Sequence, residues 1–241
     1  MRIVQTVILW LLCGVPSASS HHVAVDSVIR IKPVSDFSIT GDGTASGWSN
    51  APWTDLAVQE GVSTLSTRVK VLYSQKGVYF LFECADEKLT ATITEDNRAL
   101  FREDVVEVFL WPDQSVPIYF EYELSPLNYE LFMMVPNING KFQGWKPWYY
   151  EGEKRVKHAT AVKGEKRSNA FIRSWTAEFF IPFDLLRPMV SGMPEAGTTW
   201  RGNFYRIDYD HGYTTWSWQK TTKGVDGNFH EFKKFGRMIF E

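Results

Sequence analysis

Short stretches in which apolar and polar residues alternate recur along most of the chain. In residues 67–73 and 118–124 every second side chain is apolar, a period of two that predicts β-strands with one buried face. The tight turn 75–77 joins the first of these to the apolar run 78–84, which predicts a hairpin. This pattern strongly favours a fold built from many short strands.

About ten strands are predicted in total, separated by Gly, Pro, Asn and Asp residues. Helical periodicity is almost absent, and one short helical turn is expected over 183–187, between Pro182 and Pro188. The fold class expected is all-β, an antiparallel β-sandwich of the jelly-roll kind. The strands are predicted at 67–73, 78–84, 104–111, 118–124, 129–135, 158–163, 171–181, 200–208, 214–218 and 237–240.

Composition excludes several classes of protein. Aromatic residues make up 15% of the 241 residues, which argues against a disordered chain. A formal net charge of −2 gives no reason to bind a polyanion, so no nucleic-acid partner is expected. Because no repeat or linker interrupts the chain, residues 21–241 are expected to form a single domain.

The N-terminal stretch is typical of a secretory signal peptide. Arg2 precedes the apolar run 7–12, and small residues follow at 16–20. The apolar run is too short to span a bilayer, so no membrane partner is expected. We expect residues 1–20 to be cleaved and the protein to be secreted or periplasmic. A leader at 20–37 is expected to pair along a sheet edge, and Cys84 to be an inert thiol in the core.

Common enzyme motifs are absent from the sequence: there is no GxSxG, HExxH or paired CxxC. His158, His211 and His230 show no metal-ligand spacing, so no metal or other cofactor is expected to be required. A structural calcium stays open, since loop carboxylates can ligate it. The residues that would do so are Asp42, Asp86, Asp208 and Asp210.

Aromatic residues also gather in a loop, at Trp145, Trp148 and Tyr149. Rings in a loop either fold back onto the core or face a ligand, and both possibilities remain open here. Trp175 and Trp200, in contrast, lie in alternating strands and are expected in the core. Sugars are natural partners for rings flanked by acids and amides, because their C–H faces pack on the rings while their hydroxyls form hydrogen bonds.

Six segments, in order, resemble those of the family 9 carbohydrate-binding modules, over about residues 37–241. They are 39–53, 68–81, 101–109, 175–182, 203–208 and 217–236. The resemblance implies a β-sandwich that holds a glycan between two aromatic planes, here Phe101 and Phe229. Xylanase-attached members have tryptophan at both positions, so a smaller clamp is expected.

The resemblance also implies polar contacts to the sugar. The family's sugar-contacting glutamate falls on Glu107, whereas its basic residue on the next strand falls on Glu121, an acid. Arg206 is the candidate to replace that positive charge. The other residues expected at this site are Trp218, Asp226 and His230, with Trp145, Trp148 and Tyr149 as a secondary platform.

The function expected is therefore non-catalytic binding of an oligo- or polysaccharide, beside separate glycoside hydrolases that degrade it. Two alternatives stay open. A glycoside hydrolase would use Asp104 or Glu107 together with Glu121. A haem-binding sandwich would use His230 with Met133 or Met134 as axial ligands.

Overall fold

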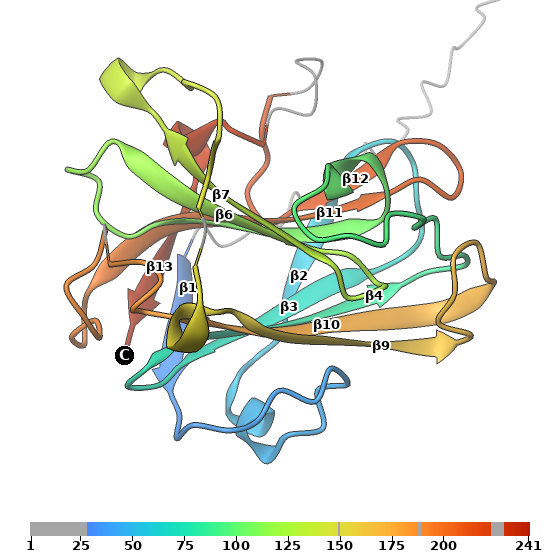
Figure 1. The fold of residues 1–241 in the computed structure, drawn as a ribbon, viewed down its shortest axis with the longest axis horizontal. Coiled ribbons are helices and arrows are strands. Elements are labelled where there is room, and N and C mark those ends of the chain that lie inside the picture. Colours follow the sequence, from blue (N-terminus) through green and yellow to red (C-terminus); the bar gives the residue numbers. More distant parts are fainter. Residues whose placement is uncertain (1–27, 149, 188, 223–228) are drawn as a thin grey trace, which may run out of the picture.

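The computed structural model describes residues 28–148, 150–187, 189–222 and 229–241, and it is a two-layered β-sandwich (Figure 1). The segment predicted as a signal peptide lies outside these residues. Within them, 13 strands are joined by hydrogen bonds: 11 form one path that folds back on itself, and the first and last strands pair beside it. The sequence therefore predicted the fold class correctly.

The upper layer of Figure 1 contains the strands that carry the candidate site. Its order is β8-β7-β6-β5-β11-β12, and β13 pairs with β11. These strands are β5 (Val105–Trp111), β6 (Ile118–Leu124), β7 (Glu130–Pro136), β8 (Lys146–Pro147), β11 (Thr199–Asp208), β12 (Thr214–Ser217) and β13 (Gly236–Phe240).

The lower layer has the order β3-β4-β10-β9, and two further strands connect it to the upper layer. β2 pairs with β12 above and β3 below, while β1 pairs in parallel with both β13 and β3. The strands are β1 (Val28–Pro33), β2 (Thr54–Glu60), β3 (Thr67–Tyr73), β4 (Gly77–Ala85), β9 (Lys157–Gly164) and β10 (Ile172–Pro182).

All ten predicted strands occur, with ends shifted by a few residues, and three strands were not predicted. β1 falls in the segment expected to pair along an edge, but its pairing is parallel, unlike the antiparallel sandwich expected. β2 lacks regular alternation, and β8 has only two residues. Short 3-10 helices are η1 (Ser46–Asn50), η2 (Leu100–Arg102), η3 (Ile138–Gly140), η4 (Gly152–Lys154) and η5 (Phe232–Lys234).

The helical turn predicted over 183–187 forms successive hydrogen-bonded turns instead of a helix. In these turns the Leu186 N–H donates to the Phe183 carbonyl at 3.0 Å. No helix in the described part of the chain has the length and apolar character needed to cross a membrane.

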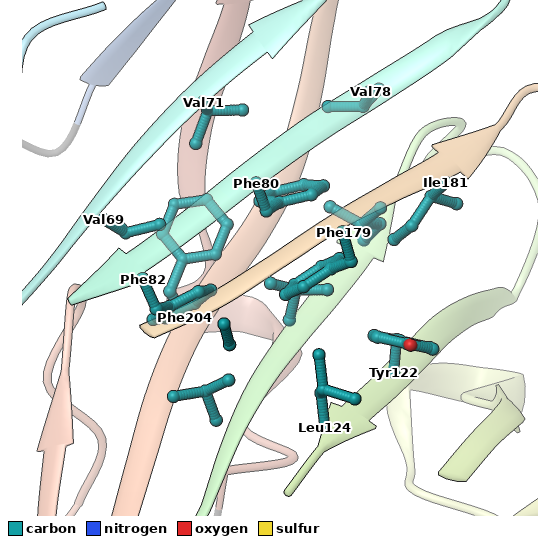
Figure 2. Packing of buried hydrophobic residues seen from close by; sticks show 14 of the residues in the cluster. Val69, Val71, Val78, Phe80, Phe82, Tyr122, Leu124, Phe179, Ile181 and Phe204 are labelled. Atoms are coloured by element: carbon teal, nitrogen blue, oxygen red, sulfur yellow. The ribbon is translucent and has the colours of Figure 1, made fainter. Parts of the chain in front are cut away.

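Aromatic residues fill the space between the layers (Figure 2). Phe80 of β4 stacks on Phe179 of β10 at 5.2 Å between ring centroids and meets Phe204 of β11 edge to face at 5.8 Å. Trp175 and Trp200 are buried in the same core, as predicted. Cys84 is also buried there, and burial raises the pKa of its thiol to about 12, so the thiol stays protonated.

Two smaller apolar clusters cover the outer faces of the layers. Beneath the lower layer, residues 34–53 pack over Tyr79 and Phe180 (Figure 1). On the upper layer, Phe109, Tyr119 and Tyr205 belong to the outer cluster, which residues 229–235 and the loop between β7 and β8 cover. The outer face of the upper layer is therefore enclosed by loops, and it carries the candidate site.

Candidate functional site

A pocket of about 290 Å³ lies on the outer face of the upper layer. Its wall combines aromatic rings with three glutamates and one histidine. The lining residues are Phe101, Glu107, Phe109, Glu121, Glu123, Trp145, Ile207, Tyr209, Tyr213, Phe229 and His230. Five residues proposed from the sequence (Phe101, Glu107, Trp145, Phe229 and His230) are thus brought together from three distant parts of the chain.

Strand periodicity positions the floor of the pocket. Glu107 on β5 lies directly across from Glu123 on β6, and Glu121 is two residues away on the same face of β6. The neighbouring residues Val106 and Val108 face the core between the layers. Alternation along two paired strands therefore gathers three carboxyl groups at one place.

The three glutamates are buried, with exposed fractions of 2% for Glu107, 3% for Glu121 and 0% for Glu123. Burial raises the pKa of Glu121 to about 8. Burial, followed by repulsion from the neighbouring glutamates, raises the pKa of Glu107 and of Glu123 well above the ordinary value of 4.5. Among the described residues that line the pocket, none is Lys or Arg.

His230 is held by hydrogen bonds from both of its ring nitrogens. Its Nδ1 lies 2.6 Å from the Tyr119 hydroxyl, and its Nε2 accepts a bond of 3.4 Å from the indole N–H of Trp145. Burial lowers the pKa of His230 to about 4, so the ring is neutral near pH 7. Because Nε2 accepts, Nδ1 carries the proton and donates to Tyr119. Phe142 stacks on the imidazole ring, with ring centroids 4.4 Å apart.

The aromatic residues differ in how much ring they offer to a ligand. Phe229 is only 5% exposed and lies flat on Tyr205, with ring centroids 4.0 Å apart. Phe101 is half-buried, whereas Trp145 is 49% exposed. Phe101 and Trp145 therefore present the larger open surfaces, and a clamp formed by Phe101 and Phe229 remains a prediction.

Arg206 and Trp218 do not reach this pocket, contrary to what the sequence led us to expect. Arg206 alternates with the outward-facing Tyr205 and Ile207 on β11, so it points between the layers. There it is fully buried and forms ion pairs of 3.0 Å with Asp86 and 2.5 Å with Asp208.

Trp218 also faces inward and stacks on Phe204 at 5.3 Å. The described wall of the pocket therefore lacks the positive charge expected from Arg206 and the additional aromatic surface expected from Trp218.

The aromatic loop divides between the two roles considered for it. Trp145 lines the pocket, whereas Trp148 folds back against the core and donates its indole N–H to the Leu185 carbonyl at 3.2 Å. Tyr149 and Asp226 lie outside the described residues.

Sequence analysis missed several lining residues. Glu123 was not proposed as a binding residue, although alternation places it on the same face of β6 as Glu121. Tyr209 and Tyr213 come from the connection between β11 and β12, and nothing in the periodicity of that segment indicates which way their rings point.

A separate carboxylate cluster bears on the expected calcium. Ligand atoms of Asp86, Asp104 and Asp210 lie within 4.8 Å of one another. Oxygen donors of this kind suit Ca²⁺, although Arg206 already contacts Asp86 and backbone N–H groups donate to Asp104. Asp208 is paired with Arg206, and Asp42 accepts bonds from Thr40 and Thr44. Of the four residues considered for calcium, only Asp86 and Asp210 thus belong to this cluster, which Asp104 completes.

The expected haem ligands do not fit that role. Both ring nitrogens of His230 are engaged by protein groups, and Met134 packs into the core between the layers. Met133 is buried in the apolar cluster on the outer face. Neither pair therefore offers two free axial ligands facing one another.

Comparison with known structures shows similar folds over most of the chain. A protein from Bacteroides uniformis ATCC 8492, for which carbohydrate binding is proposed, matches with a TM-score of 0.71 and 17% identity, covering 89% of this chain and 99% of its own. A family 9 carbohydrate-binding module from Caldicellulosiruptor kristjanssonii, in complex with cellotriose, matches with a TM-score of 0.60 and 16% identity. The match covers 89% of this chain and 93% of that module. A family 9 module from the same organism, in complex with glucose, matches with a TM-score of 0.61 and 16% identity, covering 89% of this chain and 95% of its own.

Comparison with curated proteins found no significant sequence match. A family profile described as "Carbohydrate family 9 binding domain-like" matches residues 39–241, nearly the whole span for which the sequence motifs suggested it. The chain therefore belongs to the carbohydrate family 9 binding domain-like family.

Proposed function

We propose that this protein binds carbohydrate without cleaving it, in the pocket on the outer face of the upper layer. The observation that carries the proposal is the pocket itself, because it joins open aromatic rings to buried hydrogen-bonding carboxyl groups. The family and the ligands of the Caldicellulosiruptor structures, cellotriose and glucose, support the same ligand class.

The two kinds of lining residue have complementary roles in this proposal. Phe101 and Trp145 offer ring faces on which the C–H face of a sugar packs, and Phe229 closes the pocket beside them. Glu107, Glu121 and Glu123 provide polar atoms at a fixed depth. A sugar without a matching polar group leaves a buried carboxyl unpaired, so the glutamates determine which sugar is accepted.

Removing the open rings tests the site. Phe101→Ala and Trp145→Ala are each expected to weaken glycan binding by about 1–3 kcal/mol, by analogy with the loss of other aromatic stacking contacts. Isothermal titration calorimetry with β-1,4-linked oligosaccharides measures the change. Phe171→Ala is the matched control, because Phe171 is 84% exposed and does not line the pocket.

Wild-type affinity in both pocket variants would move the site elsewhere on the protein. An equal loss in the Phe171→Ala control would show that the effect is not specific to the pocket. The thermal midpoint of each variant checks that the fold survives, because Phe101 and Trp145 lie outside the main core.

A glycoside hydrolase is a second candidate, favoured by one observation: Glu107 and Glu121 share a pocket and both have raised pKa values. Asp104 does not line that pocket and accepts backbone N–H bonds from Thr90 and Tyr209. Release of reducing sugar by the wild type, abolished in Glu107→Gln, would favour this candidate. No release from glycans that bind would favour binding alone.

The remaining parts of the proposal concern the setting of the protein. We propose that residues 1–20 are removed during export, that residues 21–241 act as a single domain, and that the protein is secreted or periplasmic. There it would hold oligo- or polysaccharide beside separate glycoside hydrolases. The supporting observations are the charged and apolar pattern of the N-terminal stretch and the family of the domain.

A further inference from the structure

The pocket holds three carboxyl groups, and no Lys or Arg is among the described residues that line it. Glu107 and Glu123 are direct cross-strand neighbours, an arrangement in which like charges repel. In the described part of the chain, no well-formed hydrogen bond satisfies either Oε atom of Glu123 or Oε2 of Glu121; the carboxyl groups of Glu121 and Glu123 face one another, and the Phe101 backbone faces Glu123. Buried polar groups are normally satisfied, so these oxygens point to a ligand.

Elsewhere in the protein, buried carboxylates have partners. Glu178 accepts the backbone N–H groups of Thr40 and Gly41, and Asp86 and Asp208 share the Arg206 guanidinium. The cluster in the pocket differs because its described lining contains no Lys or Arg side chain. The basic side chain that faces the cluster is His230, whose Nδ1 lies 3.9 Å from Oε2 of Glu121. Its pKa is lowered to about 4, so it carries no positive charge near pH 7.

The rest of the wall indicates what kind of cation fits. Phe101, Trp145, Tyr209 and Tyr213 provide aromatic rings, which attract organic cations through their π faces. A calcium or magnesium ion prefers six or more oxygen ligands, and this wall offers rings where those oxygens would be needed. An alkylammonium group can donate three hydrogen bonds to the carboxylates while its carbon neighbours pack on the rings.

We propose that the saccharide recognised here carries a free amino group, as in a glucosamine unit, and that Glu107, Glu121 and Glu123 bind its ammonium ion. This inference rests on the proposed function and narrows its substrate class. A neutral hexose leaves the buried carboxyl groups protonated, whereas the ammonium ion of an amino sugar lets them ionise and pairs with them while the sugar ring packs on the aromatic residues.

A matched series of ligands tests this inference directly. Cellotriose, the N-acetylglucosamine trimer and the glucosamine trimer share one β-1,4-linked backbone and differ only at carbon 2, which bears a hydroxyl, an acetamide or an ammonium group. Calorimetry at pH 7 is expected to show the glucosamine trimer binding at least about tenfold more tightly than the other two.

Glu123→Gln, which keeps the shape of the side chain, is expected to abolish that preference, so that the three trimers bind with affinities within about twofold of one another. Glu195→Gln, on an exposed loop, is the matched control and should keep the preference. If Glu123→Gln does not fold, proton release by the wild type provides an independent readout.

Proton release follows because a bound cation lowers the pKa of the three carboxyl groups, which then lose protons to solvent. Titrations in two buffers of different ionisation enthalpy measure the number of protons released. The other titratable groups facing the cluster are His230, Tyr119, Tyr205, Tyr209 and Tyr213. They stay neutral between pH 5 and 7, since the pKa of His230 is lowered to about 4 and those of the tyrosines are raised.

The outcomes separate the two levels of the proposal. Equal affinity for the three trimers, with no proton release, overturns the amino-sugar inference and leaves carbohydrate binding intact. If none of the trimers binds, both fail. Putrescine or calcium chloride binding as tightly as the glucosamine trimer also overturns the inference, because the pocket would then recognise charge without a sugar.

Discussion

Arg206 is one side chain that ties the two layers together. It extends from β11 of the upper layer and donates to the Ala85 carbonyl and the Thr67 hydroxyl of the lower layer, at 2.6 and 3.2 Å. Its guanidinium also pairs with Asp86 and Asp208, and it lies 4.6 Å from the Trp216 ring centroid. A buried cation of this kind is difficult to remove, because its partners stay behind in the interior.

Arg206→Met is therefore expected to lower the free energy of unfolding by about 3–5 kcal/mol, since it leaves Asp86 and Asp208 buried without their cation. Urea unfolding followed by tryptophan fluorescence measures the change. The matched control is Arg187→Met, because Arg187 forms an exposed pair with Asp184 and its loss should cost less than about 1 kcal/mol. Equal effects in the two variants would contradict the stabilising role assigned to the Arg206 network.

At the scale of elements, the segment before β2 is attached to the lower layer through one carboxylate. Glu178 of β10 is fully buried, and its Oε2 accepts the backbone N–H groups of Thr40 and Gly41 at 3.0 and 2.6 Å. Its Oε1 accepts the indole N–H of Trp48 at 2.8 Å. Gly41 has φ +88°, and a Cβ there would come within 2.9 Å of Ala159, so the turn requires glycine.

Glu178→Gln should loosen this segment, because an amide has one acceptor oxygen where the carboxylate has two and lacks the charge that strengthens these bonds. We expect a loss of about 2 kcal/mol in unfolding free energy and faster proteolysis within residues 34–53. Time-resolved proteolysis with mass spectrometry locates the cuts. Glu165→Gln, an exposed glutamate paired with Arg167, serves as control, and similar cutting in both variants would speak against the anchoring role.

For the whole molecule, buried acids determine how stability varies with pH. Burial, as the largest cause, raises the pKa of Asp86 to about 7, of Glu121 to about 8 and of Asp104 to about 9. In the unfolded chain these groups titrate near 4, so above that pH the folded state binds more protons than the unfolded state. Stability due to these groups therefore falls as pH rises toward their folded pKa values.

His230 acts in the opposite direction but in another pH range. Because folding lowers the pKa of His230 from 6.5 to about 4, this residue reduces the free energy of unfolding only as the pH falls from about 6.5 toward 4. Between pH 6.5 and 9 the buried acids determine the trend. Each acid that stays protonated in the folded state and is ionised in the unfolded state lowers the free energy of unfolding by at most about 1.4 kcal/mol for each unit that the pH rises.

We expect the urea midpoint to decrease from pH 6.5 to pH 9, and Glu121→Gln to show a shallower decrease. Equilibrium unfolding at half-unit steps of pH measures both. A midpoint that stays constant or rises over this range would contradict the pKa directions assigned to the buried acids.

The sequence by itself determined the strands and their faces, because a period of two is a local property of the chain. Residues 67–73 and 118–124 became β3 and β6 with the predicted bounds, and the residues that the family motifs indicated, Phe101, Glu107 and Phe229, line one pocket. Alternation also placed Glu123 on the same face as Glu121, although Glu123 was not proposed as a binding residue.

Only the tertiary structure decided which face of each strand turns toward the loops and which toward the second layer. Arg206 and Tyr205 are adjacent in sequence, yet one is sealed in an ion-pair network and the other supports Phe229 beneath the pocket. The opposing layer, distant in sequence, buries one face and leaves the other to the loops. For the same reason the grouping of Glu107, Glu121 and Glu123 in a pocket whose described lining has no Lys or Arg became visible only after β5, β6 and the residues that cover them were assembled.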